Sequence, residues 1–390
     1  MSKHIYSLLI AQFLSAFADN AILFTVIALV MQHPEAPGWY VPALQSVFLV
    51  AFVLLAPWVG TFADNQAKSR VLIIANLIKA AGAGLLLLKV EPLIAYCIVG
   101  VGAALYSPAK YGILPELARH DCLVKANSWI EGSTILAILT GMVVGAKVAD
   151  YSTSWALLGT IALFLISAAT TVLLPSNVSR KEVTGSKVMQ FFQEVRSFLS
   201  LPRSRFAVLG ASLFWAAAAC VRVIIVAWAP LVLMSHNASD IANLTLFLAL
   251  GIIAGSALVP HLIPLEHLRR ARIPAYFMAL LIMGLGFTDE IWPARIVLFL
   301  MGTAGGMFIV PVNAALQELG QQSIGSGGAV AMQNFFQNAA MLLSVGGYTF
   351  AASLRVGPIE ALLALGALLL LTIFLVVSRL PNNQATTIPE

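Results

Sequence analysis

The sequence predicts an all-α membrane protein with twelve transmembrane helices in two pseudo-symmetric bundles of six. Its 390 residues are 60% hydrophobic and only 10% charged, and the mean hydropathy is +0.91, whereas about a quarter of the residues in soluble domains are charged. The apolar residues form runs of about 20, the length of one spanning helix. The halves also match at an offset of 203 residues (222 minus 19), which makes Arg222 the counterpart of Asp19 and Pro311 that of Pro108. These observations indicate two copies of one bundle.

Each predicted helix corresponds to one apolar run of spanning length. The helices predicted in the first half are Tyr6–Met31, Val41–Ala63, Val71–Lys89, Leu93–Leu114, Asn127–Ala149 and Trp155–Leu174. Those predicted in the second half are Phe206–Met234, Asn243–Pro264, Ile273–Phe287, Ala294–Gln317, Ala329–Leu354 and Glu360–Arg379.

The stretch between the halves is polar and rich in Ser, Lys, Arg and Glu. It predicts a cytoplasmic interdomain loop over residues 176–204, with a short amphipathic helix at Val188–Leu199. Residues 1–175 then form the N-terminal bundle and residues 205–390 the C-terminal bundle. Two parallel halves of this kind are typical of transporters that rock around a site at the middle of the membrane.

Lysine and arginine are concentrated in alternate loops, and cytoplasmic loops carry the excess in membrane proteins. With the N-terminus inside, fifteen basic residues fall on the cytoplasmic side and four on the other side. We therefore expect both termini to be cytoplasmic. The remaining three of the 22 basic residues, Lys79, Lys110 and Arg222, lie within predicted spans.

Charges within spans are costly, by about 3 kcal/mol or more, and usually mark a transport path or a paired charge. Asp19 lies about 20 Å from the start of its helix, which is too deep for snorkelling to the interface. It is either a structural partner of Arg222 or a residue that contacts cargo. Lys110 and Glu131 lie about one turn inside their helices, so snorkelling competes with a transport role for both. Lys79 fits either reading equally.

The loop after the second predicted helix carries glycine and charged residues at a characteristic spacing, Gly60, Asp64, Lys68 and Arg70. This pattern resembles the loop 2–3 signature of the major facilitator superfamily, from which Asn65 and Ala67 depart. The resemblance implies the major facilitator fold and a cytoplasmic gate at the four matching residues. A carboxylate there can meet a helix end or a basic residue in one conformational state only.

Glycines in the fifth predicted helix have the spacing of the antiporter signature of the same superfamily. Small residues four apart let helices approach closely, and Ala146 and Ala149 replace the proline and glycine of that signature. We therefore expect close helix packing here rather than obligate antiport. The glycines concerned are Gly132, Gly141 and Gly145, with similar pairs at Gly251/Gly255 and Gly302/Gly306.

Longer stretches are similar to the bacterial lysophospholipid transporter branch of the superfamily: residues 10–21, 106–117, 124–134, 212–215 and 311–318. The resemblance implies a flippase in the bacterial inner membrane. It would carry lysophosphatidylethanolamine and related lipids from the outer to the inner leaflet. A partner acyltransferase of the acyl carrier protein synthetase type would then restore the second chain.

Such a cargo presents a phosphate, which favours Arg and Lys, and often an ammonium, which favours a carboxylate. Arg222 and Lys110 are the predicted phosphate ligands. Asp19 and Glu131 are predicted to bind the amine or to release the basic residues by alternating ion pairs. The full predicted substrate site is Asp19, Asn20, Tyr106, Lys110, Glu131, Arg222, Asn313 and Asn334. Candidate contacts for the acyl tail are Phe13, Phe17, Phe214 and Trp215.

Other classes of function fit the sequence less well. A proton-coupled exporter of amphiphilic drugs is the main alternative, although a fixed Arg222 would repel cations. A lipid acyltransferase needs a His-x-x-x-x-Asp pair, and the nearest spacing, His261 to Glu266, lacks the aspartate. A receptor or scaffold protein would have no function for the intramembrane charges.

No cofactor is expected, because the chain has no P-loop and only three scattered cysteines. The same scatter argues against a metal site. The basic residues form no continuous patch, which argues against nucleic acid. We expect a monomeric membrane transporter that is not an enzyme.

Overall fold

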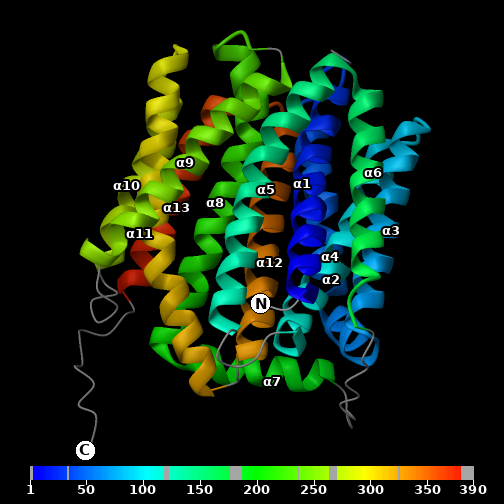
Figure 1. The fold of residues 1–390 in the computed structure, drawn as a ribbon. Coiled ribbons are helices and arrows are strands. Elements are labelled where there is room, and N and C mark those ends of the chain that lie inside the picture. Colours follow the sequence, from blue (N-terminus) through cyan, green and yellow to red (C-terminus); the bar gives the residue numbers. More distant parts are fainter. Residues whose placement is uncertain are drawn as a thin grey trace, which may run out of the picture. The chain divides into compact units, whose positions relative to one another are not determined.

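The computed structural model describes residues 3–32, 35–117, 123–175, 187–235, 237–262, 270–323 and 326–378. Within these ranges the regular elements are thirteen α-helices (Figure 1). They are α1 (Lys3–Met31), α2 (Tyr40–Asn65), α3 (Lys68–Leu87), α4 (Pro92–Leu117), α5 (Leu123–Tyr151), α6 (Thr153–Thr171), α7 (Lys187–Ser200), α8 (Pro202–Val232), α9 (Ala238–Leu262), α10 (Arg272–Leu285), α11 (Ile291–Ser323), α12 (Ser326–Ser353) and α13 (Pro358–Ser378).

Each of the twelve predicted spans coincides with one helix, and the predicted amphipathic helix is α7. Nine of the described helices are long and apolar enough to cross a membrane, and α2 and α10 contribute shorter apolar segments. The predicted class, an all-α membrane protein, is confirmed. The main differences lie at helix ends: α11 continues to Ser323, beyond the predicted Gln317.

The helices divide into two compact units. The first unit comprises Met1–Lys187 with His236–Asn243, and the second comprises Val188–Ser235 with Leu244–Glu390. The domain boundaries predicted from the sequence, at residues 175/176 and 204/205, stay a prediction.

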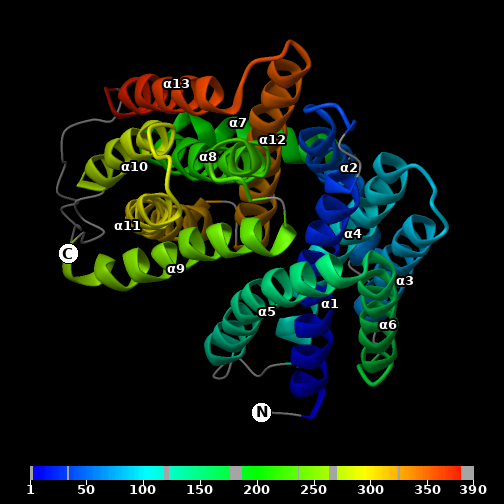
Figure 2. The same ribbon diagram turned by 90° about the horizontal axis from the view of Figure 1, so that it is seen from above.

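In the first unit, α1 lies between α5 and α6, as Figure 2 shows from above. Gly141 and Gly145 make the α1–α5 approach possible, because a Cβ at either glycine would collide with the backbone of α1 at Phe17 or Ala21. The close packing expected for this helix is therefore confirmed. α3 packs against α4 and α6, and α2 packs against α4.

Side-chain hydrogen bonds stabilise the first turns of two helices, α6 and α9, whose starts lie in the first unit. The Ser152 hydroxyl oxygen accepts a hydrogen bond from the Trp155 backbone N–H (3.4 Å) and caps α6. The Asp150 carboxylate accepts hydrogen bonds from the backbone N–H groups of Ala238 (2.9 Å) and Ser239 (2.8 Å). A carboxylate at a helix start satisfies otherwise unpaired N–H groups and complements the helix dipole.

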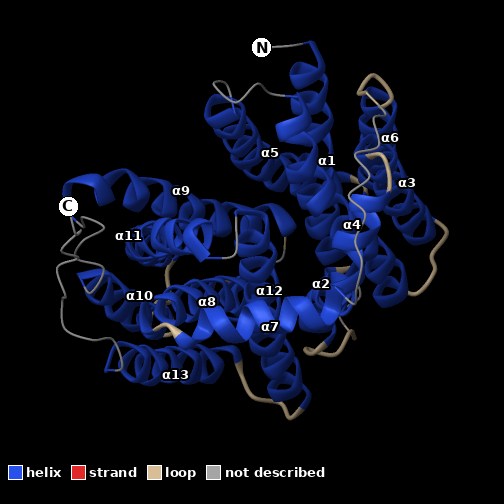
Figure 3. Ribbon diagram, turned by 90° about the horizontal axis from the view of Figure 1, so that it is seen from below, coloured by secondary structure: helices blue, strands red, loops and turns tan. Residues whose placement is uncertain are grey.

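In the second unit, α8 packs against α11, α12 and α13, and α10 packs against α11 and α13. The amphipathic α7 runs crosswise to α8 and α12 (Figure 1 and Figure 3). Its apolar face is anchored by Val195 and Phe198, which pack against Ala207, Val208 and Leu316. The helix predicted in the polar loop is thus fixed to the second unit by its own apolar side.

Glycines set the distance between α9 and α11. A Cβ added at Gly251 or Gly255 would collide with the backbone at Phe299 or Thr303 of α11. From the other side, Gly302 and Gly306 face the backbone of α9 in the same way. The two helices therefore approach to backbone contact, as the spacing of small residues predicts.

Candidate functional site

The site in the first unit is built around Asp19 of α1, whose partner is Lys79 of α3. The Lys79 Nζ–Asp19 Oδ2 distance is 2.7 Å. The Lys79 side chain is fully buried, whereas 25% of the Asp19 side chain remains exposed. The second carboxylate oxygen, Asp19 Oδ1, has no hydrogen-bond partner among the described residues. The pair thus shields one oxygen of the carboxylate and leaves the other unshared.

The Lys79 ammonium is enclosed by side chains from α1, α4 and α6 of the first unit. It donates a hydrogen bond to the Ser15 hydroxyl oxygen of α1 (3.0 Å). It also lies 4.5 Å from the centre of the Tyr106 ring of α4 and 5.4 Å from that of the Phe164 ring of α6. Aromatic faces attract a cation most strongly where water is excluded. The carboxylate, the hydroxyl oxygen and the two aromatic rings therefore together compensate the positive charge of Lys79.

A chain of hydrogen bonds leads away from Lys79 through the helix bundle. The Ser15 hydroxyl donates to Asn76 Oδ1 (2.9 Å), and Asn76 Nδ2 donates to the Ser167 hydroxyl oxygen (2.9 Å). Ser167 donates in turn to the Ala11 backbone carbonyl (2.7 Å). All three side chains are buried. Because these three side chains all have hydrogen-bond partners, the cost of burying them among α1, α3 and α6 is largely offset.

The remaining predicted residues of the first unit have varied surroundings. Asn20 donates to the Ala16 carbonyl of its own helix (2.9 Å). Lys110 is 7% exposed on α4, one turn after the buried Tyr106, and acts electrostatically on Asp19. Burial of Lys110 argues against simple snorkelling to the interface. Glu131 lies on α5, and its side chain is outside the described part of the structure.

In the second unit, the predicted residues lie on α8, α11 and α12. Arg222 is partly buried on α8. Asn313 of α11 accepts a hydrogen bond from Gln333 Nε2 of α12 (3.0 Å). The Asn334 backbone carbonyl accepts one from Asn338 Nδ2 (2.8 Å). Asp19 and Arg222 belong to different units, and their direct pairing stays a prediction.

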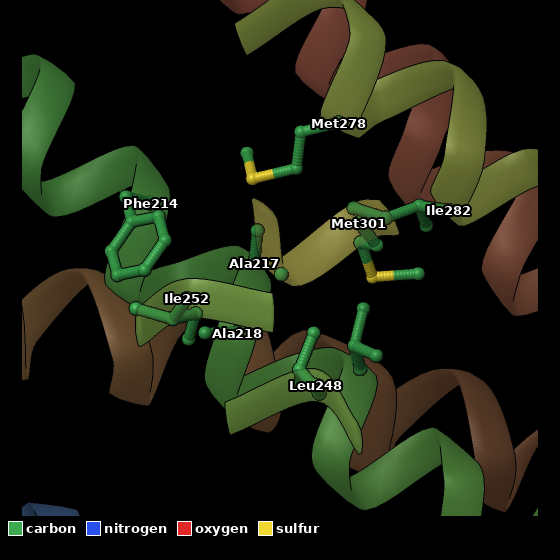
Figure 4. A pocket seen from close by; sticks show the side chains of 10 residues that line it. Phe214, Ala217, Ala218, Leu248, Ile252, Met278, Ile282 and Met301 are labelled. Atoms are coloured by element: carbon green, nitrogen blue, oxygen red, sulfur yellow. The ribbon is translucent and has the colours of Figure 1, made fainter. Parts of the chain in front are cut away.

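The second unit also holds an apolar pocket with an empty volume of about 270 Å³, part of which is open to solvent. Phe214, Met278 and Met301 point into it from α8, α10 and α11 (Figure 4). Two other lining residues, Ala218 and Ile282, are the counterparts of Ser15 and Lys79 at the offset of 203 residues. The repeat therefore places an apolar pocket where the first unit has its charged network. Of the aromatic residues predicted to contact an acyl tail, Phe214 lines this pocket.

The four predicted gating residues lie where α2 ends and α3 begins. Gly60 and Asp64 are in the last turns of α2, and their surroundings are outside the described part of the structure. Lys68 is the first residue of α3, and Arg70 in its first turn is exposed. The gate stays a prediction.

Ser15, Asn76 and Ser167 belong to the site but were not among the residues predicted from the sequence. A signal for the first was present, because Gln12, Ser15 and Asp19 are spaced to share one face of a helix. Gln12 lies beside the network and donates to the Thr134 hydroxyl oxygen (3.0 Å). Buried serines are common enough in membrane helices that their spacing alone does not single them out.

Comparison with known proteins places the chain in a family. The sequence profile of the Major Facilitator Superfamily matches residues 8–345. Lysophospholipid transporter LplT of Photorhabdus laumondii subsp. laumondii is 38% identical over 377 residues, which cover 96% of this chain and 94% of that protein. Lysophospholipid transporter LplT of Klebsiella pneumoniae (strain 342) is 39% identical over 370 residues, 94% of this chain and 93% of that protein.

Solved structures share the fold at low sequence identity. The nucleoside transporter NupG superposes with a TM-score of 0.72 at 14% identity, covering 98% of this chain and all of that one. A bacterial homologue of the human lysosomal transporter Spinster, in an inward-facing and unoccupied conformation, gives a TM-score of 0.74 at 13% identity over the full length of both chains. The thirteen helices, the matched profile and these relatives together show that the chain belongs to the Major Facilitator Superfamily.

Proposed function

We propose that the protein transports lysophospholipids, such as lysophosphatidylethanolamine, from the outer to the inner leaflet of a bacterial inner membrane by alternating access. The observation that carries this proposal is the similarity, over more than nine-tenths of the chain, to transporters named for lysophospholipids. Nothing in the described residues or among these relatives favours efflux of amphiphilic drugs.

The chemistry of the buried charges supports a phospholipid head group as cargo. Arg222 and Lys110 are proposed to bind the phosphate, since guanidinium and ammonium groups form strong charge-assisted hydrogen bonds with phosphate oxygens. Asp19 Oδ1, which has no partner among the described residues, is proposed to accept a hydrogen bond from the amine. Glu131 is proposed to act with Asp19. The remaining proposed contacts to the head group are Asn20, Tyr106, Asn313 and Asn334.

The conformational cycle needs a gate, which we assign to Gly60, Asp64, Lys68 and Arg70. A carboxylate at the end of α2 would meet a partner in one state and lose it in the other. The excess of basic residues in alternate loops supports an orientation with both termini in the cytoplasm. In this orientation the cargo reaches the cytoplasmic leaflet, where an acyltransferase partner of the acyl carrier protein synthetase type would restore the second acyl chain. We propose that the transporter works as a monomer.

Replacing Arg222 with alanine tests the proposed site. Uptake of labelled lysophosphatidylethanolamine into spheroplasts is expected to fall by about 10- to 100-fold, because a hydrogen bond to a charged group contributes about 1.5–3 kcal/mol. The amount of protein in the membrane is to be measured in parallel. The matched control is Arg196→Ala on the exposed face of α7, which is expected to transport normally.

Unchanged uptake by the Arg222→Ala variant would remove Arg222 from the site. If the unmodified protein takes up no lysophospholipid from a panel of head groups, the proposed function itself is wrong. The same panel, measured with and without a proton or sodium gradient, identifies the energy source.

A further inference from the structure

Lys79 has no place in the proposed contacts with cargo, although it is the most enclosed charge among the described residues. Its side chain is fully buried, and its ammonium contacts Asp19 Oδ2, the Ser15 hydroxyl oxygen and two aromatic rings. A carboxylate, a hydroxyl oxygen and aromatic faces are the groups that proteins use to bind organic cations. We call these four groups, from Ser15, Asp19, Tyr106 and Phe164, the cation cage.

The hydrogen bonds around the cation cage make it specific for a positive charge. The proton of Ser15 is used in the bond to Asn76 Oδ1, so the Ser15 oxygen presents lone pairs to Lys79. Asn76 is held in this orientation because its amide group donates to Ser167, whose proton goes to the Ala11 carbonyl. The hydrogen-bond chain therefore runs in one direction and fixes the Ser15 oxygen as an acceptor.

Because the Lys79 ammonium fills the cation cage, it determines which oxygen of the Asp19 carboxylate is available to another group. Oδ2 is already shared with Lys79 at 2.7 Å, so only Oδ1, which is buried in this structure, is left to bind a second cation. The ion pair with the buried ammonium also favours one orientation of the Asp19 side chain, because rotating the carboxylate away would leave Lys79 unpaired. Buried charges of this kind cost several kcal/mol when left unpaired, so the pair persists.

We propose that Lys79 is a positioning residue, a built-in counter-ion that fills the cation cage and holds Asp19 in the orientation that leaves Oδ1 for the cargo head group. The role of Oδ1 rests on the proposed function, whereas the occupancy of the cage by a cation does not. Lys79 itself does not touch the cargo. It acts by keeping external cations out of the cage and by holding the carboxylate in a single orientation.

Chemical rescue tests this role. Lys79→Ala removes the methylenes and the ammonium and leaves the cation cage empty, and propylammonium supplies the same groups from solution. Lysophosphatidylethanolamine uptake by this variant is expected to fall at least about tenfold, and added propylammonium is expected to restore most of it. Lys79→Met keeps the side-chain length without its charge and fills the same space. We expect this variant to be equally impaired and not to respond to the amine.

Two controls isolate the effect. Lys147→Ala removes an exposed lysine of α5, and both its uptake and its response to the amine are expected to match those of the unmodified protein. Thermal unfolding of the purified Lys79→Ala variant provides a readout without cargo. Propylammonium is expected to raise its Tm while leaving the Tm of the unmodified protein and of Lys79→Met unchanged.

The outcomes separate the two proposals. The role of Lys79 is overturned if Lys79→Met shows full uptake. It is also overturned if propylammonium changes neither the Tm nor the uptake of Lys79→Ala. A Tm shift with Lys79→Ala in a protein that transports no lysophospholipid supports the cation cage but overturns the proposed function. If Lys79→Ala does not accumulate, uptake by Lys79→Met decides the question.

Discussion

Asp19→Asn is expected to destabilise the protein by about 3–5 kcal/mol, the usual cost of removing one partner from a buried ion pair. The cost arises at Lys79, which is fully buried and has its only described carboxylate contact at Asp19. An asparagine oxygen can still accept a hydrogen bond from the ammonium, but it carries no charge to offset desolvation. Thermal unfolding of the purified protein in detergent measures the effect.

A double variant distinguishes the effect of removing the whole ion pair from the effect of leaving Lys79 buried without its partner. Asp19→Leu combined with Lys79→Met replaces both groups with apolar side chains, which is often neutral or stabilising for a buried pair. We expect it to unfold near the temperature of the unmodified protein while remaining inactive in lysophospholipid uptake. If the double variant is less stable than Asp19→Asn, the pair is not the source of the stability difference.

Gly255→Leu is the second substitution with a large expected effect. Any side chain at this position meets the Thr303 backbone of α11, and backbone atoms in a packed helix pair cannot move aside as a side-chain end can. Overpacking of a well-filled contact costs about 1–3 kcal/mol and sometimes more, and we expect about 3 kcal/mol or more here. Loss of folded protein from the membrane and a lower unfolding temperature are the measurements.

The matched control is Gly346→Ala on α12, where an added Cβ meets no atom within 4 Å. Alanine is favoured over glycine in a helix by about 1 kcal/mol, so this variant should be as stable as the unmodified protein or more so. If both substitutions change the unfolding temperature equally, glycine content rather than the close approach of α9 and α11 determines stability.

Much of the fold could be predicted because membrane helices leave a strong one-dimensional signal. Every backbone polar group must be satisfied within a spanning segment, so apolar length alone located twelve helices. α7 was predictable for a different reason, since Val195 and Phe198 are spaced to form one apolar face in an otherwise polar loop. The close approach at Gly251 and Gly255 was also predictable, because only small residues permit it.

The partner of Asp19 was not predictable in the same way. The repeat relates Asp19 to Arg222, but an offset between two copies identifies equivalent positions and not neighbours. Contact with Lys79 depends on how α1 and α3 are rotated about their axes, and this rotation is set by packing across the whole bundle. The roles of Asn76 and Ser167 depend on the same rotation, so they became visible only with the structure.

The apolar pocket of the second unit bears on the mechanical character of the two repeats. The hydrogen bonds from Lys79 to the Ala11 carbonyl are directional, and a buried chain of such bonds has one favoured geometry. The pocket instead contains Met278 and Met301, whose unbranched side chains rearrange at little energetic cost. The first repeat is therefore expected to be stiff and the second compliant. Under lateral pressure from the bilayer, deformation would begin in the second repeat while the geometry around Asp19 is preserved.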